Sequence, residues 1–463
     1  MLVPINIAGA TYESRSLPLS AQLTRHFYPE VQENISAKSQ LILQSFPGMS
    51  LFGTASGVDR GMIFHEGTLF KVTGNRLYSV NVLGTHTQLG TIPGSGRCIF
   101  APNGGNLVIV TGGRVFYYTS SVAEVLDSDL ESPNSAAHLN NQILYDGSSG
   151  RFASADVGDP TSINSLNYAT AETDADSLVR VYTFQQIAYM MGTQTIEPWF
   201  NSGIGKPPFD PVQGGIIQVG LGALHSVASN QTSMYWLGSD NHIYRLSGGQ
   251  ASRISPFPIA DEIGTYTDEN VSAATGFCFS FGGQEFYQIN FAARSFVFHE
   301  NSRQFFEVGE SGQRGLGNAY AYAFRKHLIA DYSNGNIYEL SQDVFDVNGS
   351  AMTRERVTGP LHGGLVGAPG KEIEINRFEL IMQTGMGAIS GQGKEPVIML
   401  QVSNDARTWS TEMWGEAGRL GEFMWKIEWG PLGAFDSCLF RITASDPVFY
   451  SIHSAAADIE IGI

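Results

Sequence analysis

Three observations on the sequence predict an all-β protein: a β-propeller of about seven blades, or six as the alternative, followed by a C-terminal β-sandwich. A short apolar run, a tight turn and an apolar-aromatic run recur about seven times across the first three quarters of the chain. Residues within these runs alternate with the period of a strand rather than that of a helix. Glycine is abundant, at 53 of 463 residues, which suits a protein with many hairpin turns.

The repeat unit is clearest at residues 67–80. The apolar run Leu69–Val72 leads into the turn Thr73–Asn75, and the run Leu77–Val80 follows. The pattern returns near six later anchors: Leu107, Ile143, Ile187, Met234, Phe286 and Leu328. Successive anchors lie about 36 to 52 residues apart, which is the spacing of four-stranded propeller blades.

Composition divides the chain into four predicted regions. These are an N-terminal arm at 1–50, the propeller at 51–358, a Gly/Pro-rich linker at 359–371 and the sandwich at 372–463. The linker is almost entirely Gly, Pro and small apolar residues, and the alternation after it predicts about six short strands. In the arm, the apolar stretch 41–46 is a candidate strand for the ring, and whether the arm closes the propeller is left open.

The sequence predicts no long amphipathic helix. Residues 164–172 and 178–182 are the candidates for a helical turn or two. The fifth repeat unit has the longest interval, and it contains Pro256-Phe257-Pro258 and the acidic pair Asp261-Glu262. We therefore expect a loop that leaves the disc at this point.

Charge and cysteine content exclude several classes of protein. The net charge of −17 argues against a protein that grips nucleic acid, because phosphate binding depends on Lys and Arg. It suits either ordinary solubility or a wall past which DNA must slide. The three cysteines are far apart and form no CxxC pair, so we expect neither a disulfide framework nor a zinc site, and a reducing compartment. No signal peptide is visible, and no apolar run approaches the about 18 residues of a membrane span.

The segment 403–409 resembles the Asp-box turn of sialidases and related propellers, although it is one residue short and lacks the glycine. In such a turn the Asp accepts bonds from loop amides and the Trp packs on the hairpin, so its role is structural. We assign structural roles to six motif residues: Phe46, Pro47, Gly48, Trp199, Asp405 and Trp409.

No motif predicts catalysis, a cofactor or a metal. Asp331–Asn336 resembles a calcium loop, but the twelfth loop position is Gln342 rather than Glu, which favours a hairpin turn. The ten histidines show no metal-binding spacing, and neither a GxSxG elbow nor a Walker loop occurs. We therefore predict a protein that is not an enzyme, with no catalytic, cofactor-binding or metal site.

An ordered set of short motifs resembles a known family across most of the chain. The motifs include Phe27-Tyr28-Pro29-Glu30, Ser45-Phe46-Pro47-Gly48, Gly94-Ser95-Gly96-Arg97, the run 195–203, Ile337-Tyr338-Glu339-Leu340 and Trp429-Gly430-Pro431-Leu432-Gly433. In their order and spacing they resemble the phage stabilisation proteins, the packaged-DNA stabilising tail-hub proteins of short-tailed, P22-like phages.

The resemblance implies a structural protein of the virion tail that is assembled in the cytoplasm of the bacterial host. It implies a homo-hexameric ring below the portal and its adaptor, which extends the DNA channel, helps to retain packaged DNA before ejection and carries spikes or fibres and a central plug or needle. Double-stranded DNA would pass through without sequence-specific binding. The family has no catalytic residues to carry over.

Two other functions also fit the sequence. The repeat and the Asp-box-like turn also fit a sialidase-like or glycan-degrading propeller, since paired carboxylates from different blades cannot be recognised in the sequence. Aromatic-rich stretches such as Glu197–Phe200 also fit a receptor-binding adhesin. Turnover of a glycan would favour the first, and direct binding to a host surface would favour the second.

Overall fold

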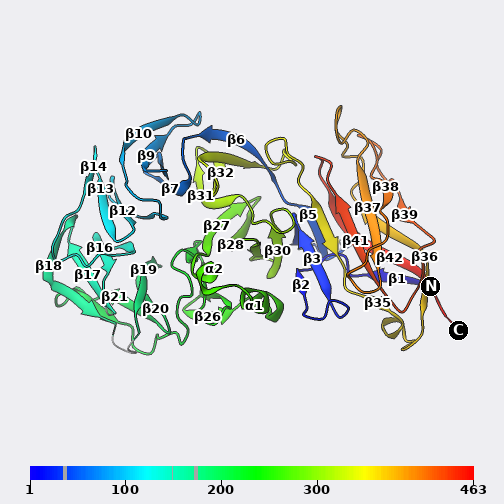
Figure 1. Ribbon diagram of the computed structural model, residues 1–463, viewed down its shortest axis with the longest axis horizontal. Coiled ribbons are helices and arrows are strands. Elements are labelled where there is room, and N and C mark those ends of the chain that lie inside the picture. Colours follow the sequence, from blue (N-terminus) through cyan, green and yellow to red (C-terminus); the bar gives the residue numbers. More distant parts are fainter. Residues whose placement is uncertain (35–38, 149, 172–175, 463) are drawn as a thin grey trace.

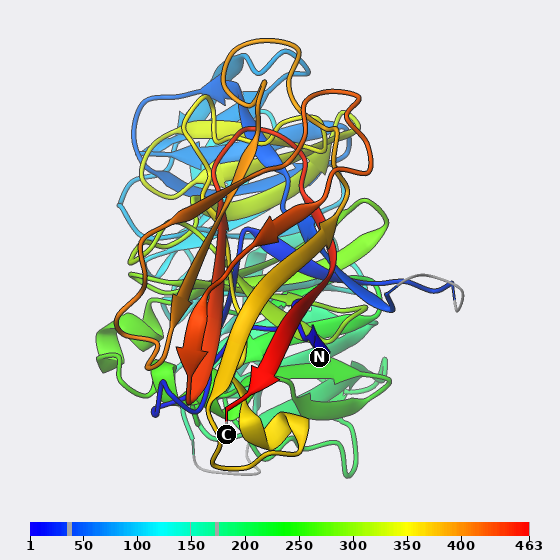
Figure 2. The same cartoon turned by 90° about the vertical axis from the view of Figure 1, so that its right-hand side faces the viewer.

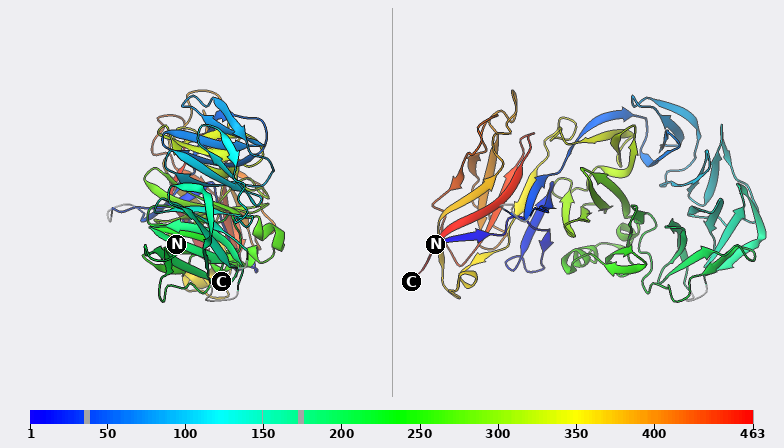
Figure 3. Two further views of the ribbon diagram at one scale, coloured as in Figure 1. Left: turned by 90° about the vertical axis from the view of Figure 1, so that its left-hand side faces the viewer. Right: turned by 180° about the vertical axis from the view of Figure 1, so that it is seen from behind.

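The computed structural model describes residues 1–34, 39–148, 150–171 and 176–462. A β-propeller and a β-sandwich lie side by side, with both ends of the chain at the sandwich (Figure 1). The view from behind shows the same arrangement (Figure 3). The prediction of an all-β propeller followed by a sandwich is confirmed.

In the described residues, the propeller contains six separate four-stranded sheets and a further four-stranded unit, β27–β30, that is continuous with a larger sheet. The first three blades are β7 (Asp59–His65), β8 (Thr68–Thr73), β9 (Arg76–Val80) and β10 (His86–Thr91); β11 (Ile99–Asn103), β12 (Asn106–Thr111), β13 (Arg114–Tyr118) and β14 (Val122–Glu124); and β15 (Ala136–Leu139), β16 (Gln142–Asp146), β17 (Arg151–Asp156) and β18 (Asp159–Thr170).

The remaining blades continue around the ring. They are β19 (Leu178–Phe184), β20 (Ile187–Gly192), β21 (Ile196–Asn201) and β22 (Phe209–Pro211); β23 (Ala228–Ser229), β24 (Ser233–Leu237), β25 (Ile243–Ser247) and β26 (Gln250–Arg253); β27 (Thr275–Phe281), β28 (Gln284–Asn290), β29 (Ser295–His299) and β30 (Gln304–Val308); and β31 (Gly317–Ala323), β32 (Lys326–Asp331), β33 (Asn336–Ser341) and β6 (Gly48–Thr54).

The ring is closed by a strand from the N-terminal region. Strand β6 pairs antiparallel with β33, so that Met49 lies opposite Leu340. The first strands of neighbouring blades contact one another: β11 contacts β15, and β31 contacts β7. These first strands therefore line the centre of the ring. Apolar side chains of the first blade, such as Leu69, share a core with those of the last, such as Leu328. Strands from two distant parts of the chain therefore hold the ring shut.

The sandwich packs two sheets over one core. One sheet has the order β39–β36–β42–β5–β4, with β1 and β40 attached; the other continues from β30 through β3, β34, β41 and β37 to β38, with β2 and β35 attached. Their bounds are β1 (Leu2–Ile5), β2 (Tyr12–Glu13), β3 (Ala21–Arg25), β4 (Phe27–Val31), β5 (Leu41–Ser45), β34 (Arg354–Val357), β35 (Leu361–His362), β36 (Ile373–Met382), β37 (Val397–Ser403), β38 (Met413–Glu416), β39 (Ile427–Trp429), β40 (Gly433–Phe435), β41 (Ser437–Ala444) and β42 (Ser451–Ile461). The rings of Phe378 and Phe440 stack across this core at 4.5 Å.

The N-terminal region differs from the expected arm. Residues 41–45 form β5, which pairs with β4 and β42 in the sandwich, and the ring strand is the next one, 48–54. The change of sheet occurs at Phe46-Pro47-Gly48. Phe46 is buried against Phe279 and Phe306 of the sixth blade. Gly48 is required because a Cβ there would lie 2.5 Å from the carbonyl oxygen of Asp346.

The expected linker also contains paired structure. Strand β35 pairs with β41, and the short 3₁₀-helix η1 (Gly363–Val366) follows it. Leu361 is buried in the sandwich core, which explains why this Gly-rich segment is fixed to the sheet. The predicted domain boundaries at 50, 358 and 371 stay a prediction.

Helical turns occur at the expected loop rather than at the expected helical segments. Strands β18 and β19 run through residues 159–170 and 178–184, and residue 172 of the first expected segment lies outside the described residues. Helices α1 (Phe257–Ile263) and α2 (Asp268–Ser272) lie in the long fifth interval. Pro258 lies in the first turn of α1, where its missing N–H removes no hydrogen bond within the helix. The side chain of Thr267 caps α2 by accepting a hydrogen bond from the Asn270 N–H. Neither α-helix of the described residues has the length and apolar character of a membrane span.

Candidate functional site

A cluster of basic side chains lines the centre of the propeller. Arg97 precedes β11, Arg180 lies on β19 and His225 precedes β23. Together with small and apolar residues of β7, β27 and β31 they line a cavity of about 170 Å³. The centre of a chain with a net charge of −17 is therefore locally basic. We call Arg97, Arg180 and His225 the axial cluster.

Both arginines of the axial cluster are held by backbone carbonyls. Arg97 Nη2 donates to the Asn318 carbonyl at 2.7 Å, and Arg180 Nη1 donates to the Leu224 carbonyl at 2.6 Å. The guanidinium of Arg180 also lies 5.1 Å from the centre of the Tyr182 ring. Each arginine keeps a further buried nitrogen, Nη1 of Arg97 and Nε of Arg180, for which the described residues offer no acceptor.

Burial and mutual repulsion perturb these groups. Burial lowers the pKa of Arg180 to about 10, and the positive charge of Arg97 acts in the same direction. Burial, followed by the charges of Arg97 and Arg180, holds the pKa of His225 well below its usual value. At neutral pH the cluster therefore carries two positive charges and a neutral imidazole.

A second candidate surface lies on loops of the sandwich. The side chains of Ile389, Leu420, Phe423 and Met424 are 84%, 59%, 67% and 95% exposed, and Trp425 lies beside them in sequence at 45%. We call these five residues the sandwich-loop patch. They lie on two loops, residues 383–396 and 417–426. Backbone hydrogen bonds join these loops, such as that from the Gly421 N–H to the Gly385 carbonyl at 3.0 Å.

These loops connect β36, β37, β38 and β39 and project from the top of the sandwich in Figure 2. Large apolar side chains that are exposed on adjoining loops are candidates for interaction surfaces. Aromatic residues and Met are also the types enriched at protein interfaces. The sandwich-loop patch is therefore a candidate contact with another protein.

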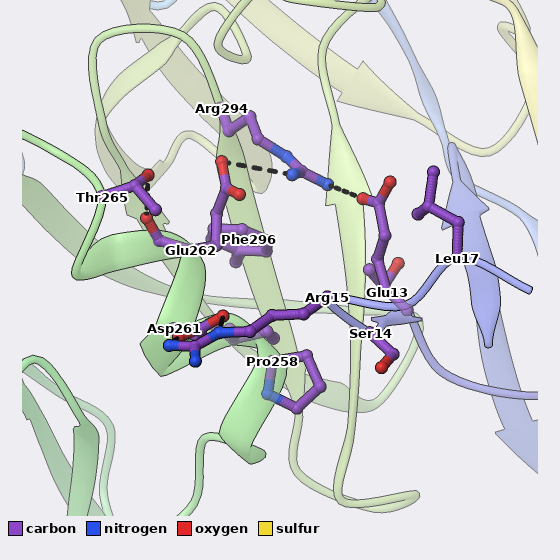
Figure 4. Close-up of a pocket in the computed structure, with 12 residues that line it drawn as sticks. Glu13, Ser14, Arg15, Leu17, Pro258, Asp261, Glu262, Thr265, Arg294 and Phe296 are labelled. Atoms are coloured by element: carbon purple, nitrogen blue, oxygen red, sulfur yellow. Dashed lines mark hydrogen bonds and ion pairs between the residues drawn. The ribbon is translucent and has the colours of Figure 1, made fainter. Parts of the chain in front are cut away.

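A charged pocket of about 260 Å³ lies between the N-terminal segment and α1 (Figure 4). Arg294 forms ion pairs with Glu13 and Glu262, both at 3.3 Å, and with Glu307 at 2.6 Å. Arg15 pairs with Asp261 on α1. Because each of these acids is paired with an arginine of the chain, the ion pairs around this pocket fasten the N-terminal segment to the propeller.

The Asp-box-like segment forms a hydrogen-bonded turn. Asp405 Oδ1 accepts from the backbone N–H groups of Arg407 and Thr408, each at 2.8 Å, and the Ser403 hydroxyl donates to the Thr408 carbonyl at 2.7 Å. The bonds from Thr408 and Arg407 hold the pKa of Asp405 below its usual value. The Arg441 guanidinium lies 4.0 Å from the centre of the Trp409 ring. These contacts describe a turn in the sandwich, outside the propeller.

Trp199 packs between blades instead of facing solvent. Its ring makes an edge-to-face contact with Phe152 at 5.1 Å, and its Nε1–H donates to Glu197 at 3.3 Å. In the stretch Glu197–Phe200 only Phe200 is exposed. The aromatic run that suggested an adhesin is therefore a largely buried strand.

The six predicted structural residues lie at three separate places: the change of sheet at 46–48, a blade interface and a sandwich turn. The axial cluster was missed, although Arg97 stands in one of the motifs that carry the family resemblance. A usable signal was a basic residue on or just before the first strand of a repeat unit, where apolar residues are expected. Among the described residues no group of three or more His, Cys, Asp or Glu side chains could hold a metal ion.

Comparison with protein families decides the relationship. A family model described as "Bacteriophage P22 Gp10, beta-propeller" matches residues 1–345, and one described as "Bacteriophage P22 Gp10, beta-sandwich" matches residues 361–460. The chain belongs to the P22 Gp10 family of phage stabilisation proteins. The predicted family is thereby confirmed, and this member of the P22 Gp10 family is a bacteriophage structural protein of the tail-hub type. The first 45 residues fall within the propeller match although most of their strands pair in the sandwich sheets.

Other comparisons give distant likenesses. No curated protein matches the chain. The extracellular domain of a putative hybrid two-component system of B. thetaiotaomicron is 9% identical, with a TM-score of 0.44, over 75% of this chain and 45% of that one. The Neurospora crassa Pan2 WD40 domain is 10% identical, with a TM-score of 0.42, over 64% and 95%. The computationally designed Ika8 protein is 8% identical, with a TM-score of 0.40, over 64% and 99%. These scores are too low to support an inference.

Proposed function

We propose that this P22 Gp10 family member is a subunit of a hexameric tail hub or nozzle. The ring lies below the portal and its adaptor, extends the DNA channel, retains packaged DNA until ejection and anchors spikes or fibres and a plug or needle. The observation that carries this proposal is the match of both family models, which together cover nearly the whole chain. The protein works by assembly in the virion tail, without catalysis.

The join between propeller and sandwich suits a part that bears load. Strand β3 pairs with β34 of the sandwich and, through a bridge from Arg25 to Glu307, with β30 of the sixth blade. Arg25 also forms an ion pair with Glu355 at 2.7 Å, and its side chain is 11% exposed. A β-sheet that continues from a blade into the sandwich resists bending between the two bodies.

The sandwich-loop patch supports contact with a neighbouring copy of the chain. Its exposed apolar side chains would be covered in a ring, and its aromatic and Met residues are the types that anchor interfaces. We place the subunit contact here and leave the adaptor, spike and needle to other faces of the molecule.

Charge and redox state support passage of DNA and assembly inside a bacterium. A net charge of −17 disfavours adhesion of phosphate to the outer surface, so double-stranded DNA would slide without sequence-specific binding. Cys98, Cys278 and Cys438 are free thiols, as expected for a chain that folds in the reducing host cytoplasm.

Electron microscopy of the purified chain, alone and with portal-adaptor complexes, tests the assembly. We expect particles with sixfold symmetry on the portal-adaptor complex. Met424→Asp should abolish the ring by burying a charge in the subunit contact, while Leu126→Asp, at a propeller residue that is 87% exposed, should leave it intact. A chain that stays monomeric and does not associate with portal-adaptor complexes would refute the proposal.

A further inference from the structure

The axial cluster has unused hydrogen-bonding capacity at the centre of the propeller. Arg180 is only 9% exposed, and its Nε has no acceptor among the described residues. The same holds for the buried Nη1 of Arg97. Buried donors of this kind are normally satisfied, and each exception requires an explanation.

Neither arginine forms an ion pair with a carboxylate of the described residues, and the charges of Asp59 and Asp146 only partly offset the lowering of the arginine pKa values by burial. Asp59 is paired with Lys71 at 2.9 Å and accepts from the Asn318 side chain at 2.8 Å. Asp146 accepts from the backbone N–H groups of Asn134 and Ser135. The carboxylates that face the cluster are therefore bound to other groups, and positive charge remains in excess.

Other groups around the cavity add no negative charge. Burial raises the pKa of the Cys98 thiol to about 11, so that it stays protonated near neutral pH. Burial, followed by the charge of Arg97, lowers the pKa of Arg314 to about 10, so a third cation acts on the cluster from outside the cavity lining, where Asp331 partly offsets it. Arg60, on β7, already donates to the carbonyls of Gly74 and Ile92.

We propose that the axial cluster binds a free tetrahedral oxyanion, inorganic phosphate or the isosteric sulfate. The two arginines would direct charged N–H donors at its oxygens, which is the pairing that guanidinium groups favour, and His225 would donate from its neutral ring. The cavity, at about 170 Å³, is smaller than the about 300 to 1,000 Å³ typical of sites for larger ligands.

The bound anion would connect distant blades. Arg97 stands at the start of the second blade, Arg180 on the first strand of the fourth, and His225 just before the fifth. An oxyanion held by all three would tie their central strands together across the axis and remove the repulsion between the arginines. The site stiffens the disc from within, and it does not depend on the proposed ring.

Two measurements on the full chain test the site: calorimetric titration with sodium phosphate, and thermal unfolding in the presence of sodium phosphate. Sodium chloride at equal ionic strength is the reference in both. We expect saturable binding of phosphate and a rise in unfolding temperature beyond that in chloride, since a ligand of the folded state stabilises it. Arg97→Gln and Arg180→Gln should each weaken phosphate binding by tenfold or more. Arg114→Gln, at an exposed residue paired with Glu124, should leave it unchanged.

A third variant of the axial cluster and two further ligands complete the test of phosphate binding. If an arginine variant fails to fold, His225→Gln, which removes no charge, should weaken phosphate binding several-fold while the protein stays folded. Sulfate should compete with phosphate, and a short DNA duplex should not. The proposal is overturned if phosphate and chloride stabilise the chain equally, if the Arg114→Gln control loses binding to the same extent, or if DNA displaces phosphate from the cluster.

Discussion

The propeller and the sandwich are built from opposite kinds of connectivity. Each described blade uses consecutive strands, except that β6 joins β31–β33. In the sandwich, β1, β4 and β5 from the first 45 residues share a sheet with β36 and β42 from the last hundred. The propeller is therefore a sum of local units, whereas the sandwich forms only when the two ends of the chain meet.

This difference assigns separate roles to the N-terminal region. Residues 41–45 complete the sandwich and residues 48–54 complete the ring, and Phe46-Pro47-Gly48 connects the two. A change that loosens the first 45 residues should damage the sandwich first. A change within one blade should be felt mainly by that blade and its neighbours.

The largest expected effect is at Arg356, which is fully buried on β34. Its guanidinium donates to the carbonyls of Ile7 at 2.7 Å and Ala10 at 3.1 Å, and to the Thr24 hydroxyl at 3.0 Å. Arg356→Met leaves these acceptors without a donor, and we expect the free energy of unfolding to fall by about 2 to 5 kcal/mol. Chemical denaturation measures the loss.

Hydrogen exchange locates that damage. Protection should be lost in residues 1–34 and in β34, and largely kept in the distant blades β11–β18. Arg377→Met is the control, because its side chain on β36 is 44% exposed and its nearest acid, Glu428, lies 3.8 Å away. Equal loss of protection in the distant blades would show that the two bodies do not unfold separately.

The same contrast explains what the sequence could predict. Repeats such as Leu69–Val72 with Leu77–Val80 are local, so strand period and turn chemistry were enough to predict blades. Strand β5 lies in the sandwich rather than in the ring, because its pairing with β42, about 400 positions away, leaves no local pattern in the sequence. The Pro256–Glu262 segment was expected to be a loop, but Pro at a helix start is equally consistent with α1.

The candidate sites were less predictable than the fold. The Asp405 turn follows from residue chemistry that acts within a few positions, whereas Trp199 packs on Phe152 of the neighbouring blade. The axial cluster brings Arg97, Arg180 and His225 together from different blades, and their meeting depends on the ring radius and on how each strand faces the axis. The exposed run Leu420–Trp425 is a loop, and its function depends on which partner protein contacts it. A pattern in the sequence of one chain does not encode that partner.

A pH effect should appear at the join of the two bodies. His26 Nδ1–H donates to the Thr353 carbonyl at 2.7 Å, and Nε2 accepts from the Gly309 N–H at 2.8 Å. Burial lowers its pKa from 6.5 to about 4, so the folded state holds the neutral ring. The neutral His26 ring therefore contributes its full stabilisation above the pKa of His26 in the unfolded chain. This stabilisation is lost as the pH falls towards the pKa of His26 in the folded protein.

We expect up to about 3 kcal/mol to be lost through His26 between pH 6.5 and 4. His299 adds to the loss, because burial also lowers its pKa to about 4. His26→Asn, which tolerates the positive φ of 51° there, should flatten the pH dependence of the unfolding free energy. His362→Asn, at a half-buried ring on β35, should leave the dependence steep. An unchanged slope in His26→Asn would place the acid sensitivity elsewhere.

The smallest effect should come from the turn at Asp405, because its bonds are exposed and local. Asp405→Ala removes the acceptor for the N–H groups of Arg407 and Thr408, so the turn should fray while β37 stays paired with β41. Amide exchange at residues 406–408 should accelerate, with an unfolding temperature close to that of the parent. Asn404→Ala, at the exposed neighbour, is the control. A large fall in unfolding temperature would mean that this turn supports the whole sandwich. Local contacts would then contribute as much to the stability of the sandwich as the pairing between the two ends of the chain.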